Sequence, residues 1–144
     1  MKRKYLTETL MEKFDFGQAR VYLLQRQQEK TAFRHQRFEA AWHDFREIVT
    51  LLIEHYHPRR IYQWGSLLNE ATFSEISDID IAVEGHFPPE IFFAMVREAE
   101  QRTSFSLDFV DLNKMEPEFA DIIRAKGRLV YESQPPTSFA PDRD

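Results

Sequence analysis

Two aspartates in an alternating run are the side chains of this sequence best suited to chemistry. Asp78 and Asp80 alternate with isoleucine in Asp-Ile-Asp-Ile-Ala-Val, and alternation of period two predicts a strand. Their carboxylates would then share one face, about 6 to 7 Å apart along the backbone. Because two such carboxylates repel each other unless a cation lies between them, and Mg²⁺ prefers carboxylate oxygens, this strand predicts a metal site.

A glycine–serine pair upstream of the aspartates predicts a phosphate site. Gly65 and Ser66 end an apolar run. Glycine lets the backbone approach a ligand closely, and a serine at the turn into a helix can cap that helix while free N–H groups face a phosphate. A second alternating run, 106–112, offers Asp108 as a third acid on a neighbouring strand. Three carboxylates on adjacent strands suit a displacement that uses two metal ions.

The order of these motifs resembles a known family. Gly-Ser, Asp-x-Asp and hydrophobic-Asp-hydrophobic-hydrophobic are followed by a short helical segment and by Gly-Arg-Leu-Val-Tyr at 127–131. This order closely resembles the minimal nucleotidyltransferases of the DNA polymerase beta superfamily, over residues 58–132. The resemblance implies an α+β fold, a mixed small β-sheet of the nucleotidyltransferase type flanked by helices, with an N-terminal helical extension.

The resemblance also implies roles for the motif residues. Gly65 and Ser66 would grip the triphosphate of ATP. Asp78 and Asp80 would bind Mg²⁺, and Asp108 would complete the metal site or activate the attacking hydroxyl. Asp111 is the weaker candidate for the third acid, because the family pattern places that acid at the first aspartate of Leu-Asp-Phe-Val.

The function that this resemblance implies is the transfer of AMP from ATP to a hydroxyl. Small stand-alone relatives commonly act as antitoxins that adenylylate a tyrosine of a partner HEPN toxin. Two alternatives remain open at this point. One is a binding module that neutralises a partner by contact without catalysis, and the other is a transferase for a small molecule of the aminoglycoside type.

Composition limits the remaining classes. The chain has 144 residues, of which 42% are hydrophobic, so it can bury one hydrophobic core. A net charge of -5 argues against a broad electrostatic grip on nucleic acid, which we expect only as the target of a toxin. The chain has no cysteine, which excludes disulfides and cysteine-based zinc sites. Since we find no signal peptide and no membrane-spanning stretch, we expect a cytoplasmic protein.

The elements that must position the motifs follow from periodicity and from proline and glycine. We expect four strands near 60–64, 78–84, 106–112 and 128–131. We expect a short helix or turn at 66–73, a helix from Pro88 or Pro89 to about Arg102, and a helix at 116–126 that Gly127 closes.

The N-terminal third of the chain is predicted to be helical. Residues 1–57 contain one glycine and no proline. Asp-Phe-Gly-Gln at 15–18 has the form of a capping box, so a long helix should begin near residue 16, after a short helix at about 5–13. An amphipathic pattern then extends from Phe38 to Tyr56.

A single helix over 16–57 would be about 60 Å long, whereas a compact chain of this size has a radius of gyration of about 15 Å. The helix should therefore either break in the polar stretch 25–31 or project as an arm that contacts another chain through 21–24, with a homo-oligomer as one outcome. We expect a helical extension at 1–35, a nucleotidyltransferase domain at 36–132 and a flexible tail at 133–144.

Overall fold

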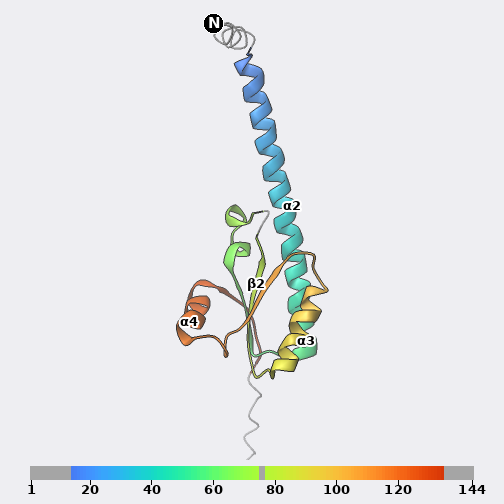
Figure 1. Cartoon of the computed structure of the whole chain (residues 1–144), viewed down its shortest axis with the longest axis vertical. Helices are drawn as coiled ribbons and strands as arrows, with labels where there is room; N and C mark the ends of the chain where they lie inside the picture. The colour runs from blue at the N-terminus through green and yellow to red at the C-terminus, as the bar shows by residue number, and fades with distance from the viewer. Residues whose placement is uncertain (1–13, 75–76, 135–144) are drawn as a thin grey trace, which may run out of the picture. The chain divides into compact units, whose positions relative to one another are not determined.

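A computed structural model describes residues 14–74 and 77–134 of the chain. Three α-helices and four strands make up the described residues, with two short 3-10 turns between the first two strands (Figure 1). Their bounds are α2 Phe16–Tyr56, β1 Arg60–Trp64, η1 Gly65–Leu68, η2 Glu70–Thr72, β2 Ile79–Glu84, α3 Pro89–Glu100, β3 Leu107–Asp111, α4 Pro117–Lys126 and β4 Arg128–Glu132. The predicted helix at about 5–13 and most of the predicted tail lie outside the described residues.

The long helix α2 begins where the capping signal predicts. The carboxylate of Asp15 accepts a hydrogen bond from the backbone N–H of Gln18 at 3.1 Å, as a helix cap does. The helix continues as one α-helix through the polar stretch 25–31, so the alternative in which it breaks there does not occur. Its buried side chains begin only at Ala41. The chain divides into two compact units, residues 1–33 and 34–144.

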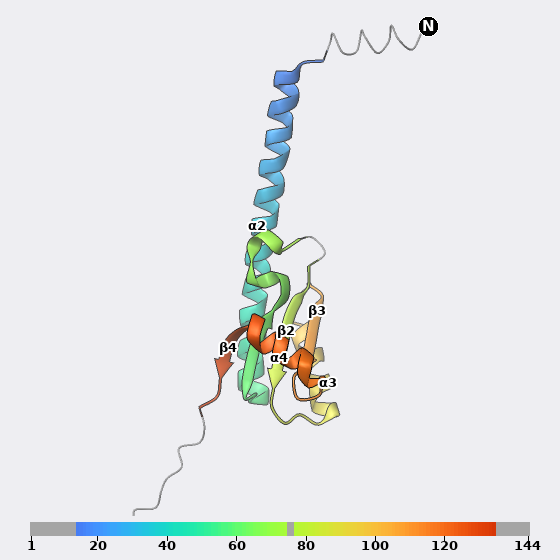
Figure 2. The ribbon, with the colours of Figure 1, turned by 90° about the vertical axis from the view of Figure 1, so that its left-hand side faces the viewer.

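The four strands form one mixed sheet in the order β3-β2-β1-β4 (Figure 2). β1 is antiparallel to both of its neighbours, β2 and β4. β2 and β3 are parallel, and a parallel pair requires a crossover connection. The crossover contains α3, which begins at Pro89 because proline suits the first turn of a helix.

Each face of the sheet packs against different helices. Residues of α2 and α3 join Ile61, Ile81 and Val83 in one buried cluster. Ala120 and Ile123 of α4 join residues of the opposite face in a second cluster. Figure 1 accordingly shows α4 on one side of the sheet and α3 on the other. The structure confirms the predicted α+β fold, a small mixed sheet flanked by helices.

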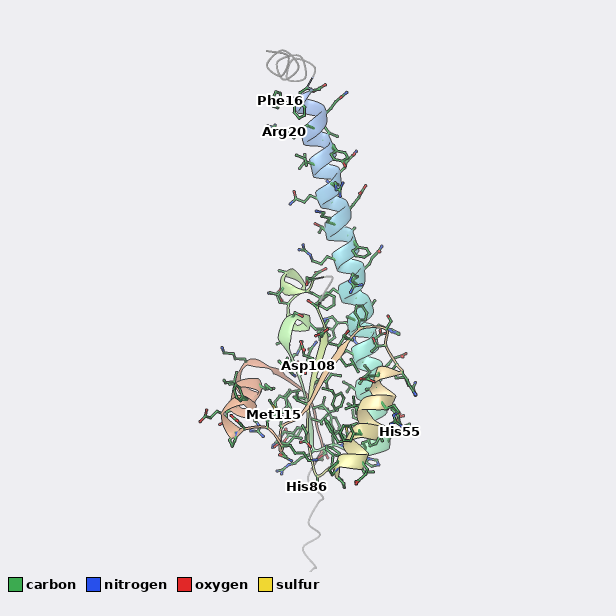
Figure 3. The ribbon with its side chains drawn as sticks, in the orientation of Figure 1. Phe16, Arg20, His55, His86, Asp108 and Met115 are labelled. Carbon is green, nitrogen blue, oxygen red and sulfur yellow. The ribbon has the colours of Figure 1, made fainter. Side chains whose placement is uncertain are left out.

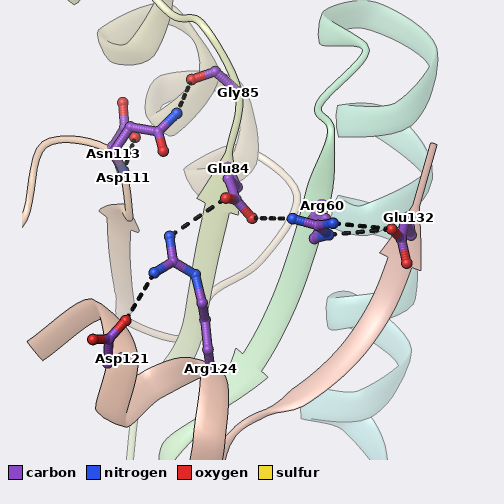
Figure 4. Close-up of polar contacts among 8 residues, drawn as sticks. All are labelled: Arg60, Glu84, Gly85, Asp111, Asn113, Asp121, Arg124 and Glu132. Carbon is purple, nitrogen blue, oxygen red and sulfur yellow. Dashed lines mark hydrogen bonds and ion pairs between the residues drawn. The ribbon is translucent and has the colours of Figure 1, made fainter. Parts of the chain in front are cut away.

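A network of ion pairs extends across the sheet to α4 (Figure 4). Glu84 at the end of β2 accepts from Arg60 of β1 at 3.2 Å and from Arg124 of α4 at 3.4 Å. Arg60 also pairs with Glu132 of β4, and Arg124 pairs with Asp121. Since the side chain of Glu84 is only 13% exposed, its charge is neutralised by these two arginines before any ligand is considered.

Candidate active site

Gly65 and Asp80 lie in direct contact at one end of the sheet. Trp64, the last residue of β1, is the register partner of Asp80. Gly65 follows with a φ of +77°, and a Cβ atom at this position would overlap the carboxylate of Asp80. The next residue, Ser66, donates its backbone N–H to the same carboxylate. Glycine is therefore required here by both conformation and space, and the Gly-Ser turn is built against the acid.

Three carboxylates are placed around this end of the sheet. Asp80 of β2 and Asp108 of β3 are register partners on adjacent parallel strands. Asp108 is labelled in Figure 3. Asp78 precedes β2 by one residue and lies two positions from Asp80, on the same side of the extended chain. Asp80 is only 9% exposed, whereas Asp78 and Asp108 are exposed. One buried carboxylate is thus accompanied by two that solvent reaches.

The environment of Asp80 disfavours its negative charge. Burial is the main cause, followed by the charges of Asp108 and then of Asp78, and together they raise the pKa of Asp80 to about 7. The hydrogen bond from the backbone of Ser66 acts in the opposite direction. A cation at this position would relieve both the burial and the repulsion.

The donor set fits a hard divalent cation that is shared with a phosphate ligand. In this structure, no three histidine or acidic side chains of the described residues are close enough to hold a metal ion alone. Mg²⁺, however, is commonly held by one or two carboxylates together with waters and substrate phosphates. Asp80 with Asp78 or Asp108 meets that smaller requirement, and the remaining oxygens would come from a nucleotide.

The turn after Gly65 differs from the sequence prediction in how it is held. Ser66 does not cap the following 3-10 turn: Trp64 occupies the cap position, and no side chain bonds there. Instead, the hydroxyl of Thr72 donates to the backbone oxygen of Ser66 at 3.1 Å. The side chain of Asn69 accepts from the N–H of Ala71 at 3.0 Å. Sequence reasoning missed Asn69 and Thr72, although asparagine before a short turn is a recognisable capping signal.

An ion pair also connects this turn to α2. Nδ1 of His35 lies 2.5 Å from a carboxylate oxygen of Glu70, which belongs to η2. Both side chains are substantially exposed, so this contact contributes little to stability. It places His35 of α2 beside the turn that follows Gly65.

Asp111 is separated from the three acids. It is the register partner of Val83, three residues further along β3 than Asp108, so the two positions are about 10 Å apart. An odd spacing on a strand also turns the two side chains toward opposite faces of the sheet. The structure therefore brings Asp108, and not Asp111, beside Asp80.

This fold and this site define a class. A small mixed sheet that carries acids on adjacent strands beside a Gly-Ser turn is the arrangement of a nucleotidyltransferase. The family model described as polymerase beta, nucleotidyltransferase, matches residues 46–136, which is more than half of the chain. The chain belongs to this family, and the prediction that it is a nucleotidyltransferase is confirmed.

Solved structures of toxin–antitoxin complexes share the fold. A chain of the MntA–HepT complex matches with a TM-score of 0.50 and 20% identity, over 63% of this chain and 72% of that one. A toxin–antitoxin structure with AMP-PNP gives 0.51 and 22%, over 61% and 73%. A complex of a tri-AMPylated HEPN toxin from Shewanella oneidensis with its MNT antitoxin gives 0.50 and 20%, over 65% and 74%. At such identities the likeness is one of fold. No curated protein matches the sequence significantly.

Among the helices of residues 14–74 and 77–134, none is both long enough and apolar enough to span a membrane.

Proposed function

We propose that this protein transfers AMP from ATP to a hydroxyl of a protein partner, a tyrosine of a HEPN-type toxin, and so acts as an antitoxin. The observation that carries the proposal is the buried carboxylate of Asp80, which meets Asp108 across two strands and the Gly65–Ser66 backbone at the end of a third. Two of the structures that share the fold contain, by their descriptions, AMP-PNP or an AMPylated toxin.

We assign each residue of the site a part in this reaction. Asp78 and Asp80 would hold Mg²⁺, and the backbone of Gly65 and Ser66 would hold the triphosphate. When bound, Mg²⁺ neutralises the phosphate charge that develops during transfer. Asp108, the exposed member, would complete the metal site or accept the proton of the incoming hydroxyl. The hydroxyl oxygen forms a bond to the α-phosphorus while the bond to pyrophosphate breaks, so AMP passes to the acceptor.

A protein acceptor agrees with the charge of the chain. A net charge of -5 gives no general attraction for a nucleic-acid backbone. Catalysis in such a site consists mainly of positioning and charge neutralisation, and a partner protein can supply a tyrosine already in position.

The transfer is tested by incubating the protein with Mg²⁺, ATP labelled at the α-phosphate and the product of the neighbouring gene. We expect label on the partner, an intact-mass increase of one or more AMP groups, and a loss of about a hundredfold or more for Asp78→Asn and Asp80→Asn. Asp121→Asn removes the same charge from an exposed site on α4 and should transfer as the wild type does. Transfer by Asp80→Asn at the wild-type rate would refute the proposed roles.

A second candidate function is neutralisation of a partner by contact alone. It is favoured by a group of exposed apolar side chains in the unit 1–33, at the start of α2 and just before it. They are Phe14, Phe16, Val21, Tyr22, Leu23 and Leu24. Exposed apolar groups of this number commonly mark a protein contact. If Asp80→Asn binds and inhibits the partner as well as the wild type without labelling it, contact is the function. Label on an added aminoglycoside would instead indicate a small-molecule acceptor.

A further inference from the structure

A cavity of about 1010 Å³ lies at the end of the sheet opposite to Asp80. It forms where β2 and β3 end and β1 begins, between the last residues of α2 and the segment that leads into α3. Figure 3 labels His86, which lines the cavity, at one end of the sheet and Asp108 toward the other. None of the proposed catalytic residues lines it. A role for the cavity must therefore be separate from the transfer site.

The wall of the cavity contains a buried carboxylate oxygen that has no partner. Asp111 is 6% exposed. Its Oδ1 accepts a hydrogen bond from the backbone N–H of Asn113 at 3.0 Å, but Oδ2 has no hydrogen-bond partner among the described residues. A buried acceptor without a donor is costly, and the cost is higher for a charged group. Solvent does not reach Oδ2 in this structure, so a ligand with an N–H donor would remove that cost once a small shift of the wall exposes the oxygen.

The same wall is held firmly by the loop contacts around Asp111 (Figure 4). The side chain of Asn113 donates to the backbone oxygen of Gly85 at 2.6 Å. The ammonium group of Lys114 donates to the backbone oxygen of Phe87 at 2.9 Å. These two bonds join the end of β3 to the loop after β2. The end of β3 beside the carboxylate is therefore fastened to the loop after β2.

Two basic side chains line the rest of the cavity, although the whole chain is acidic. They are Arg59 and Lys114, and the other acid of the cavity, Glu84, is already paired with Arg60 and Arg124. In the described part of the chain no acceptor pairs with the guanidinium of Arg59. An unpaired guanidinium beside a neutralised glutamate favours a carboxylate or a phosphate.

The positions of Arg59 and Asp111 set the size of the ligand. Arg59 directly precedes β1, Asp111 ends β3, and β2 lies between these strands, so the two residues are two strand spacings apart across the sheet. Arg59 is also two residues out of register with Asp111, which makes the separation of the two backbones about 12 Å. Arg59 is two positions from Ile61, and Asp111 is two positions from Phe109. Ile61 and Phe109 belong to the cluster on the face that α2 and α3 cover. They consequently lie on the same face of the sheet, on two sides of one cavity.

We propose that this cavity is a second ligand site, which binds a small organic anion that also carries an amino or amide N–H group. The phosphate or carboxylate of the ligand pairs with Arg59, and its N–H group donates to Oδ2 of Asp111. Neither ligand group alone satisfies the site. An anion without an N–H group leaves Oδ2 of Asp111 without a donor, and an N–H group without an anion leaves Arg59 without an anionic partner.

The test compares three probes that differ by one group. Glucosamine 6-phosphate carries the anion and the amine, glucose 6-phosphate only the anion, and glucosamine only the amine. Binding is measured by calorimetry and by amide chemical shifts, with the full chain and without Mg²⁺ or nucleotide. We expect the aminated phosphate to bind about tenfold or more tightly than either of the other probes, with shifts at 85–88 and 111–114.

Two variants then assign the contacts. Asp111→Asn keeps the acceptor for Asn113 and should reduce the affinity for the aminated phosphate to that for glucose 6-phosphate. Arg59→Gln should weaken both phosphates, whereas Arg97→Gln, an equal charge change on the exposed side of α3, should change neither. The proposal fails if no probe binds saturably at millimolar concentration, or if Asp111→Asn binds the aminated phosphate as tightly as the wild type. Neither result bears on AMP transfer.

Discussion

Gly65 is the residue at which sequence and structure give different reasons for the same amino acid. The sequence suggests a glycine that lets the backbone approach a phosphate. The structure shows that the first group to use this space is the carboxylate of Asp80, which a Cβ atom would overlap. The glycine therefore positions an acid of the site as well as exposing the turn to a ligand.

Gly65→Ala should accordingly damage both stability and transfer. The positive φ and the overlap with Asp80 together should lower the free energy of unfolding by at least about 1 to 3 kcal/mol. AMP transfer should fall further than stability explains, because the carboxylate must move. Chemical denaturation and the labelling assay measure the two effects.

The matched control is Gly17→Ala in the first turn of α2. A Cβ at this position would lie 3.2 Å from Oδ1 of Asp15, the oxygen that caps the helix, so this flexible side chain must shift slightly. Since alanine favours helix, we expect the free energy of unfolding to change by no more than about 0.5 kcal/mol. Equal stability of Gly65→Ala and the wild type would show that the turn adjusts freely and is not built against Asp80.

At the residue scale, the sequence predicts which motifs form the site, but it does not predict which of their side chains lie next to one another. Strand alternation places Asp78 with Asp80, and it separates Asp108 from Asp111 by face. It cannot say that Asp108 is the register partner of Asp80, because register depends on how two distant segments pair. The support of the turn by Thr72 and the orphaned oxygen of Asp111 likewise depend on tertiary contacts. The proposed catalytic roles stay predictions.

At the element scale, the sequence predicts the strands and the C-terminal helices to within a few residues. Alternating runs define β2 and β3, and prolines mark where α3 and α4 begin. Of the two alternatives that the sequence left open for α2, the break at 25–31 does not occur, for a physical reason. That stretch contains no glycine or proline to stop a helix, and the compactness argument assumed that every turn is buried, whereas the buried side chains begin at Ala41.

One buried residue between the sheet and α2 is polar although its neighbours are apolar. Gln63 of β1 is fully buried, alternates with Ile61 of the larger cluster, and has neither its amide nitrogen nor its amide oxygen hydrogen-bonded in the described structure. Gln63→Met keeps the shape and removes the unsatisfied amide. We expect the free energy of unfolding to rise by about 1 to 3 kcal/mol in urea denaturation.

Gln36→Met, on the exposed surface of α2, should change stability by no more than about 0.5 kcal/mol. If Gln63→Met is less stable than the wild type, the amide of Gln63 has a partner that stabilises the core, such as a buried water.

At the scale of the whole molecule, the chain consists of two units that contribute unequally to the core. The sheet, α3, α4 and all of the buried side chains of α2 belong to the unit 34–144. Described side chains before residue 34 bury little, and several of them are apolar. We propose that the first unit serves partner binding and that the second folds and carries the transfer site.

A chain that begins at Arg34 should therefore fold and melt within a few degrees of the full-length protein, as measured by circular dichroism. It should retain nucleotide binding with Mg²⁺ and bind the partner or a second copy of itself more weakly, as measured by calorimetry and light scattering. Loss of cooperative melting would show that residues 1–33 stabilise the sheet. Unchanged association would remove these residues from the interface.

The order of the strands has one further consequence. β3 and β4 are the two margins of the sheet, each only five residues long. Asp108 is exposed on one margin, and Arg128 and Glu132 are exposed on the other. A foreign strand that added to either margin would have to desolvate these ionic groups. The sheet is thereby protected against open-ended polymerisation by strand addition at its two margins.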